Sequence, residues 1–175
     1  RRLNVVLEHN KTVQKNSYNT AGFRVYTQHY PQALQQFFLY HEKKLVAEFT
    51  APFEAKLPVH AAHPISRRYI YWHDQPVGLI DYDLAPTGEL LVMHSDHLGA
   101  VHTISDQKQQ LRWAAQYDTF GRLQSSQGDL NLHLRRAGQY YDLATGWHVN
   151  GVRTYLPQQG HYLEPDPLGP SPFSQ

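Results

Sequence analysis

A short frame recurs along the chain and constrains its fold more than any other sequence feature. YNTAGFRV (18–25) and YDTFGRL (117–123) each contain a tyrosine, a small polar residue, two spacers, a glycine and a closing apolar residue. Asn or Asp followed by Gly favours a turn, which places the tyrosine and the apolar residue on two successive strands. YHEKKLVAE (40–48) and YDLATGW (141–147) are degraded copies of this frame. Each unit is one hairpin that cannot bury its face alone, so the units must stack.

Short strand-like runs, separated by turn-forming residues, extend this pattern over most of the chain. The 12 Tyr, 7 Phe and 3 Trp belong to residue types that favour strands. The runs cover 35–40, 44–49, 67–72, 76–82, 89–94, 100–105, 110–118, 122–126 and 130–137. The last of them, LNLHLRRA, alternates apolar and polar residues as a strand with one buried face does. We therefore predict an all-β fold of successive antiparallel β-hairpins, interrupted by a proline-rich loop at 50–66.

Composition excludes several classes of protein. The length of 175 residues corresponds to one domain or part of one. No apolar run approaches the roughly 18 residues of a membrane-spanning helix, and the scattered Lys and Arg form no basic stripe, so neither a membrane span nor a nucleic-acid partner is expected. The absence of cysteine excludes disulfides and thiol catalysis. The chain begins with Arg1 and its only methionine is Met93, which indicates either a trimmed or incomplete chain or a fragment excised from a longer polypeptide.

Four further motifs follow one another from residue 69 onward. They are YIYWHDQPVGLID (69–81), HSDHLGAVHTISD (94–106), WAAQYDTFGRL (113–123) and RRAGQYYDLATGWHVNGVRTYLPQQGHYLEPDPLG (135–169). With the tyrosine frame, they resemble the Rhs/YD-repeat proteins, the shell-forming family of bacterial polymorphic toxins, and also the C component of insecticidal toxin complexes. The resemblance divides the chain into degenerate YD-repeat strands (1–68), an Rhs repeat-associated core (69–169) and a proline-rich tail (170–175).

The resemblance implies a spiralling β-sheet that forms part of a hollow shell around a toxin domain. The partners it implies are the remaining Rhs shell polypeptide or a toxin domain, together with self-association through sheet edges. The location it implies is bacterial, cytoplasmic before export and then secreted or delivered to target cells, by type VI secretion or by toxin complexes. The chain is too short to build a whole shell and nothing like a toxin follows its last motif. We therefore expect a structural fragment, the C-terminal wall or plug of a shell, without its own toxin domain.

In many members of this family the closing motif carries an aspartyl self-cleavage site that frees the toxin. Such chemistry needs two neighbouring carboxyl groups in different protonation states. Asp166 occupies the position of the family's second carboxylate, but Leu156 stands where its partner is usual, and Pro170 replaces a leucine at the cleavage position. We expect Asp166 to lie near Arg153, without efficient cleavage between Gly169 and Pro170. The alternative function is an aspartyl autoproteolytic processing domain with Asp166 and Arg153 at its catalytic centre.

Other chemistry has less support from the sequence. His94 and His97, like His60 and His63, are spaced i, i+3, and on a strand such residues face opposite sides, so no metal is expected. No phosphate-binding or dinucleotide-binding glycine motif is present, so no cofactor is expected. The tyrosines favour sheet packing, and a glycan- or protein-binding β-module is the weaker alternative.

Overall fold

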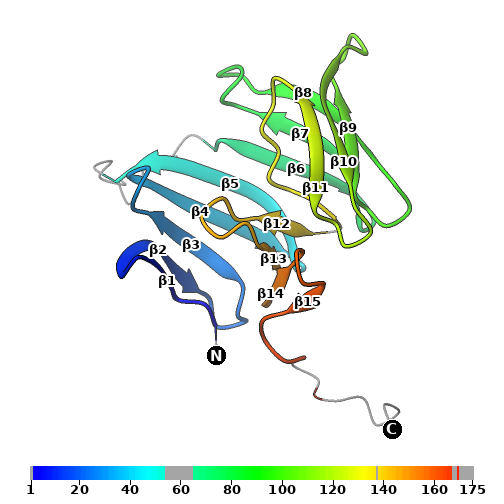
Figure 1. Cartoon of the computed structure of the whole chain (residues 1–175). Coiled ribbons are helices and arrows are strands. Elements are labelled where there is room, and N and C mark those ends of the chain that lie inside the picture. The colour runs from blue at the N-terminus through cyan, green and yellow to red at the C-terminus, as the bar shows by residue number, and fades with distance from the viewer. Residues whose placement is uncertain (1, 54–64, 137, 167–168, 170–175) are drawn as a thin grey trace, which may run out of the picture.

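The chain folds into two antiparallel sheets (Figure 1). The computed structural model describes residues 2–53, 65–136, 138–166 and 169, and in these ranges the regular structure is strand with no helix. The larger sheet contains β1 (Val5–Glu8), β2 (Lys11–Tyr18), β3 (Arg24–His29), β4 (Leu34–His41), β5 (Lys44–Pro52), β6 (Arg67–Trp72), β7 (Gln75–Asp81), β8 (Glu89–Ser95), β9 (Val101–Ser105), β10 (Leu111–Tyr117) and β11 (Leu123–Gly128). The smaller sheet contains β12 (Gln139–Tyr141), β13 (His148–Asn150), β14 (Arg153–Leu156) and β15 (His161–Tyr162).

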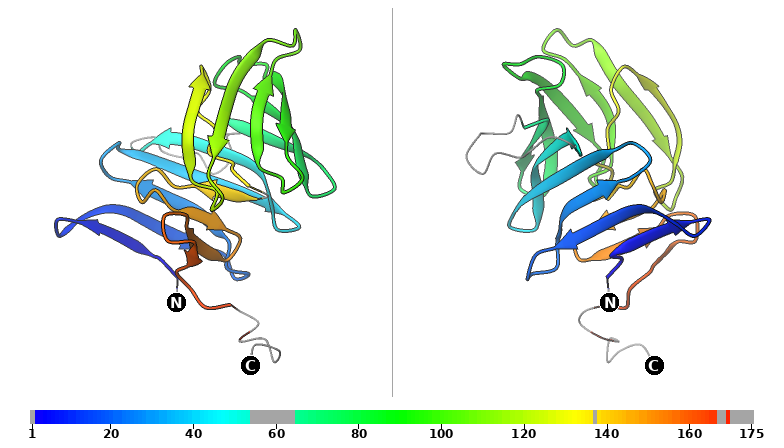
Figure 2. Two further views of the ribbon diagram at one scale, coloured as in Figure 1. Left: turned by 45° about the vertical axis from the view of Figure 1, so that its right-hand side comes forward. Right: turned by 90° about the vertical axis from the view of Figure 1, so that its left-hand side faces the viewer.

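The strand order of both sheets follows the chain without a crossover. The 11-stranded sheet runs from β1 to β11 and is not closed into a barrel, and the four-stranded sheet runs from β12 to β15. The predicted all-β fold of successive antiparallel hairpins is therefore confirmed. Within the larger sheet, the strand pairing is shortest between β5 and β6, where only Ala47↔Arg68 and Glu48↔Arg67 pair. Figure 2 shows that the β1–β5 and β6–β11 parts of the sheet lie at an angle to each other on either side of this short ladder.

The recurrent sequence frame forms a five-residue turn closed by a single Asp or Asn side chain. In the turn after β10, Asp118 Oδ1 accepts the backbone N–H groups of Phe120 and Arg122, both at 2.9 Å. Gly121 takes a φ of 83° there, in the left-handed region that glycine adopts at no steric cost. The turn after β2 repeats the arrangement, with Asn19 Oδ1 accepting the N–H of Phe23 at 2.9 Å. The frame therefore corresponds to a defined hairpin turn.

Two further copies of this turn, which the frame did not reveal, begin at Asp96 and Asp106. Each aspartate again accepts two backbone N–H groups, two and four residues further on. In the Asp106 copy the left-handed position is held by Gln109, with a φ of 63°, in place of glycine. That substitution removes the glycine by which the frame is recognised. The turn geometry is retained because the aspartate satisfies the exposed N–H groups.

Eight of the nine predicted strand-like runs each overlap one strand, from β4 to β11. The prediction for 130–137 is wrong as far as that stretch is described: residues 130–136 make only one isolated bridge, Leu134↔Tyr140. Leu130, Leu132 and Leu134 are nevertheless buried, so the alternation correctly marked a buried side. Alternation of apolar and polar residues indicates that one side of a segment is buried, whereas a strand also requires a neighbouring strand to which its backbone is hydrogen-bonded. The predicted loop is shorter at its start, because β5 continues to Pro52; residues 54–64 and 170–175 lie outside the described residues.

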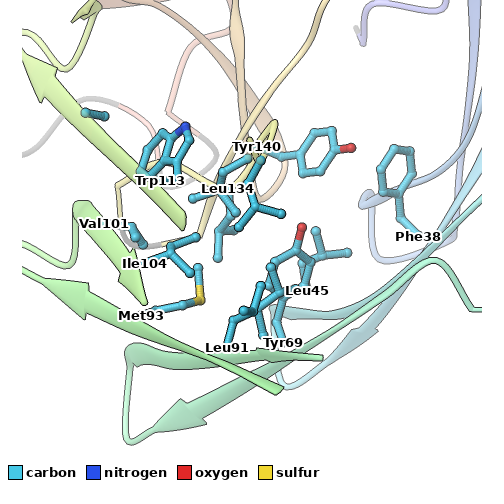
Figure 3. Packing of buried hydrophobic residues seen from close by; sticks show 14 residues of the cluster. Phe38, Leu45, Tyr69, Leu91, Met93, Val101, Ile104, Trp113, Leu134 and Tyr140 are labelled. Atoms are coloured by element: carbon cyan, nitrogen blue, oxygen red, sulfur yellow. The ribbon is translucent and has the colours of Figure 1, made fainter. Parts of the chain in front are cut away.

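A single hydrophobic core lies between the inner face of the larger sheet and the stretch that follows β11. The sheet contributes Leu45, Leu79, Leu91 and Ile104, which are almost fully buried. Further core members are Phe38, Tyr69, Met93, Val101, Trp113, Ala115, Leu130, Leu132, Leu134 and Tyr140 (Figure 3). The chain after β11 thus turns back onto the inner face of its own sheet and leads into the smaller sheet.

Candidate functional site at the C-terminal motif

The smaller sheet brings the two predicted site residues together. Arg153 opens β14, and Asp166 follows β15 by four residues. Arg153 Nη1 donates to Asp166 Oδ2 at 3.0 Å, and the guanidinium lies over the Tyr162 ring at 3.8 Å from its centroid. The predicted proximity of Asp166 to Arg153 is therefore confirmed. A catalytic role for either residue stays a prediction.

Glu164, the nearest carboxylate in the sequence, is held by β14. Its Oε2 accepts the backbone N–H of Thr154 at 2.6 Å and its Oε1 accepts the Thr154 hydroxyl at 3.1 Å. The backbone N–H of Leu163 also donates to the Thr154 carbonyl, at 2.8 Å. Both oxygens of Glu164 therefore serve as acceptors that fasten the end of the chain to β14.

Leu156, at the position where the resemblance predicts the carboxylate partner of Asp166, is the buried last residue of β14. It pairs with His161, and the N–H of Gly160 donates to its carbonyl at 2.8 Å, which closes the turn into β15. Its side chain is 6% exposed and has no group that accepts or donates a proton. The motif thus presents an Arg–Asp ion pair beside a buried leucine, in place of two carboxyl groups that share a proton.

A cavity of about 700 Å³ lies beside this motif, between the residues before β1, the end of β2 and the C-terminal motif. Arg153 and Glu164 line it from the C-terminal side, and Asn16 and Tyr18 line it from β2. Burial raises the pKa of the Tyr18 phenol, with Arg24 opposing. The cavity wall is polar, in contrast to the mostly apolar lining of small-molecule sites.

Asp142 joins the smaller sheet to the larger one through a buried ion pair. Arg24 on β3 donates to Asp142 Oδ2, and Gln14 on β2 donates to the same oxygen at 2.7 Å. Burial alone would raise the pKa of Asp142, but Arg24 and the hydrogen bond from Gln14 hold this pKa below its ordinary value. The other oxygen accepts the N–H groups of Ala144 and Thr145, so this aspartate also closes its own turn. The Tyr-Asp pair of the degraded copy at 141–147 was the only sequence signal for it.

A second buried carboxylate, Glu48 on β5, was missed by the sequence reasoning. Tyr69 donates to its Oε1 at 2.9 Å and Tyr140 donates to its Oε2 at 2.5 Å. Burial raises the pKa of Glu48, with Arg67 and the two tyrosine hydroxyls opposing. Nothing in the alternation of β5 distinguishes this residue from a solvent-facing glutamate. Its partners are 21 and 92 residues away in the sequence.

Two histidines lie in the C-terminal arm, the described residues from 129 to 166: His148 is buried and His133 is partly buried. His133 Nδ1 lies 2.9 Å from the Tyr140 hydroxyl, and His148 Nδ1 lies 2.8 Å from Gln139 Oε1. Burial lowers the pKa of His133 to about 3 and that of His148 to about 4, and Arg135 adds to both shifts by repulsion. Both side chains are therefore neutral at neutral pH.

The described residues contain neither a candidate metal site nor a membrane-spanning helix. Among the described residues no group of three or more His, Cys, Asp or Glu side chains has the geometry of a metal site. His94 lies 2.9 Å from the Ser105 hydroxyl, whereas His60 and His63 fall outside the described residues. The part of the chain that the structure describes holds no helix long and apolar enough to cross a membrane.

Two bacterial toxins are among the known proteins that are similar to this chain in sequence. No protein-family model matches the chain. Toxin protein Tse5 of Pseudomonas aeruginosa is 36% identical over 85 residues, which are 46% of this chain and 6% of that protein. Double-stranded DNA deaminase toxin A of Burkholderia cenocepacia is 35% identical over 81 residues, 43% of this chain and 6% of that toxin. The putative uncharacterized protein YibJ of Escherichia coli is 31% identical over 98 residues, 55% of this chain and 42% of that protein. The chain thus spans a small part of the two toxins that it matches.

Solved structures show the same fold over nearly the whole chain. The Photorhabdus luminescens Tc holotoxin pore with mutated TccC3 matches 94% of this chain with a TM-score of 0.70 and 15% identity, over 8% of its own chain. The crystal structure of TcdB2-TccC3 matches 94% of this chain with a TM-score of 0.67 and 18% identity, again over 8% of its own chain. At these identities the likeness concerns the fold. The chain is therefore similar to Rhs-family toxins in sequence and to the Tc toxin shell in fold, which confirms the predicted resemblance to the Rhs family and to the C component of insecticidal toxin complexes.

Proposed function

We propose that this chain is a structural section of a toxin-encapsulating Rhs-type shell, the wall and inward-turning C-terminal plug. One observation carries this proposal: the segment after β11 folds back onto the inner face of the 11-stranded sheet and is fastened there through Asp142. Arg24 and Asp142 are 118 residues apart, and their side chains are each only 3% exposed. This buried ion pair fixes the segment after β11 to the inner face of the large sheet, as a plug attached to a shell wall requires.

A second fastening lies further along the same inner face. Tyr140 donates to Glu48 and packs edge-on against Phe38, with ring centroids 5.0 Å apart. Tyr155 on β14 donates to the carbonyl of Phe120 at 2.9 Å, in the turn between β10 and β11. The C-terminal arm is therefore attached to both parts of the large sheet. A plug that closes a shell requires such attachment to the wall.

The open edges of the large sheet support a partner that continues it. The edge strand β1 carries Val5 and Leu7, which are 43% and 59% exposed. The other edge strand, β11, is exposed along most of its length. Unpaired strand edges are templates for pairing with another chain. In this proposal the neighbours are further Rhs shell polypeptide, or a second copy of this chain. The division into repeat strands (1–68), core (69–169) and tail (170–175) is part of the same proposal.

The proposal includes export from a bacterial cell. The similar proteins named as toxins are bacterial, and a toxin shell acts after secretion or delivery to a target cell. The delivery route remains the expectation drawn from the resemblance, either type VI secretion or an insecticidal toxin complex.

The proposal also holds that the C-terminal motif does not cleave itself efficiently. Supporting this, Asp166 is ion-paired with Arg153, Glu164 is occupied by Thr154, and Leu156 supplies no second carboxyl group. Peptide cleavage by carboxylates needs two carboxyl groups, one protonated and one ionised. The alternative, an aspartyl autoproteolytic domain, is favoured only by the placement of Asp166 beside Arg153.

A chain extended past Gln175 tests the two functions against each other. We expect the extended chain to migrate on a gel and weigh by intact mass as one uncleaved polypeptide. Leu156→Asp, alone or with Pro170→Leu, should introduce some scission if the missing carboxylate is the defect, and Leu156→Asn is the matched control that carries no ionisable group. Spontaneous scission of the unmodified sequence near residue 169, lost in Asp166→Asn, would make this chain a processing protease and overturn the structural proposal.

The shell role itself is tested by reconstitution. An Rhs shell polypeptide that lacks its own closing region is mixed with this chain and analysed by size-exclusion chromatography with light scattering. We expect a stoichiometric complex. Its formation should be lost when Val5 and Leu7 are both replaced by lysine, because charged side chains on an edge strand oppose pairing with another chain. A monodisperse monomer that binds neither the shell polypeptide nor further copies of itself would contradict the proposal.

A further inference from the structure

A second cavity, of about 210 Å³, lies between the large sheet and the stretch after β11 and has no role in the proposed function. Its floor is formed by buried residues of the sheet: His29, Glu48 and Ser66. Its mouth is formed by exposed residues: Gln32, Thr50, Asp83, Asn131 and Leu143. The cavity therefore leads from solvent to a buried carboxylate.

The volume limits what this cavity accepts. Sites for drug-sized ligands measure about 300–1,000 Å³, so this cavity is smaller than such a site. It corresponds to roughly seven water molecules at the ~30 Å³ that each occupies in the liquid. A single long side chain or a small amine is an occupant of the right size.

The charges around the cavity select a cation. The carboxylates of Glu48 and Asp83 line the cavity beside the guanidinium of Arg67, and Asp81, which is not a lining residue, pairs with Arg67 as a third carboxylate. Arg67 already donates to Asp81 at 2.9 Å and to the Asn131 carbonyl at 2.7 Å, and its nearest approach to Glu48 is 3.7 Å. Burial raises the pKa of Asp83, and Asp81 raises it further. The cluster thus contains more carboxylates than cations, and an entering cation would relieve their repulsion.

The mouth also offers apolar contact. Leu34 lies in the wall, and Leu143, which is 55% exposed, lies at the rim. Lys and Arg side chains bury an aliphatic stem along apolar surface and direct the charged head group elsewhere. Here the stem would lie against the two leucines while the head group reaches Glu48. An inorganic cation would make no use of this apolar rim.

We propose that this cavity binds a guanidinium or ammonium group carried on an aliphatic stem, with the head group at Glu48 and the stem against Leu34 and Leu143. Two sources share this chemistry: an arginine or lysine side chain of a partner polypeptide, and a free alkylamine. The proposal does not depend on the shell role, because it concerns groups within this chain alone.

Calorimetric titration of the full chain with N-acetyl-arginine amide tests the site, with N-acetyl-citrulline amide as its neutral isostere. We expect the arginine probe to bind and the citrulline probe to bind at least about tenfold more weakly, because hydrogen bonds between charged groups are the stronger ones. Asp83→Asn, at the exposed mouth, should weaken the arginine probe about threefold. Glu8→Gln, an exposed acid on β1, is the matched control and should leave binding unchanged.

Glu48→Gln should abolish binding of the arginine probe, and the Asp83 variant keeps the test valid if the Glu48 variant does not fold. Agmatine and the peptide acetyl-Gly-Arg-Gly-amide distinguish the two sources. Tighter binding of the peptide supports a partner side chain, and tighter binding of agmatine supports a small amine. Equal affinity for the arginine and citrulline probes, equal effects of Asp83→Asn and Glu8→Gln, or no binding of any cationic probe would overturn the proposal.

Discussion

Replacing Asp142 by asparagine tests the fastening of the C-terminal arm most directly. The substitution keeps an oxygen that can close the local turn but leaves the Arg24 charge buried without its counter-ion. That guanidinium lies over the rings of Phe38 and Tyr140, with its central carbon 5.1 and 5.9 Å from their centroids, and has little access to water. Removing one partner of such a buried pair costs about 3–5 kcal/mol. For a chain of this length the loss corresponds to a drop in melting temperature of roughly 6–20 °C.

The assay is urea unfolding followed by tyrosine and tryptophan fluorescence, with a parallel thermal scan. Asp166→Asn is the matched control, because it removes the same charge from an exposed ion pair, where the expected cost is below about 1 kcal/mol. The double variant Arg24→Met with Asp142→Asn removes both charges and should recover most of the loss. If Asp142→Asn costs no more than Asp166→Asn, the buried pair does not fasten the arm and the reasoning is refuted.

Three further predictions follow from the structure. The pKa values of about 3 for His133 and about 4 for His148 lie below the ordinary value of 6.5, so the unfolded chain binds more protons than the folded chain between these values. The stability that both histidines contribute is therefore complete above pH 6.5 and is lost as the pH falls toward 4. Urea midpoints that are equal at pH 7.5 and pH 5 would contradict this prediction. Asp118→Ala should lower the urea midpoint, because two backbone N–H groups lose their acceptor, and an unchanged midpoint would contradict this. Gly128→Ala should destabilise the protein clearly more than Gly138→Ala. Both glycines have a positive φ, but only a Cβ at residue 128 would meet a backbone oxygen, at 2.2 Å. Equal melting temperatures for the two variants would contradict this prediction.

The hairpins were predictable because their determinants are local. The short apolar run of β8 and the Asn or Asp of the recurrent turns act over fewer than about eight residues, so a single sequence carries the whole signal. The contact between Arg153 and Asp166 was predictable for a different reason, since the resemblance to a known family placed both residues in one motif. The stretch 130–136 was wrongly expected to be a strand, because its buried leucines face the inner side of a sheet that it does not join.

The sequence by itself determined the all-β class, most strand positions and the turns, because strand pleating and turn chemistry are encoded by neighbouring residues. Only the tertiary structure decided which carboxylates are buried and what they contact. Asp142 meets Arg24 across 118 residues, and Glu48 meets Tyr140 across 92. Such pairs depend on how the end of the chain returns over the sheet. That path is set by the burial of Leu132, Leu134 and Tyr140 against the whole inner face, a sum over distant strands that no local pattern contains.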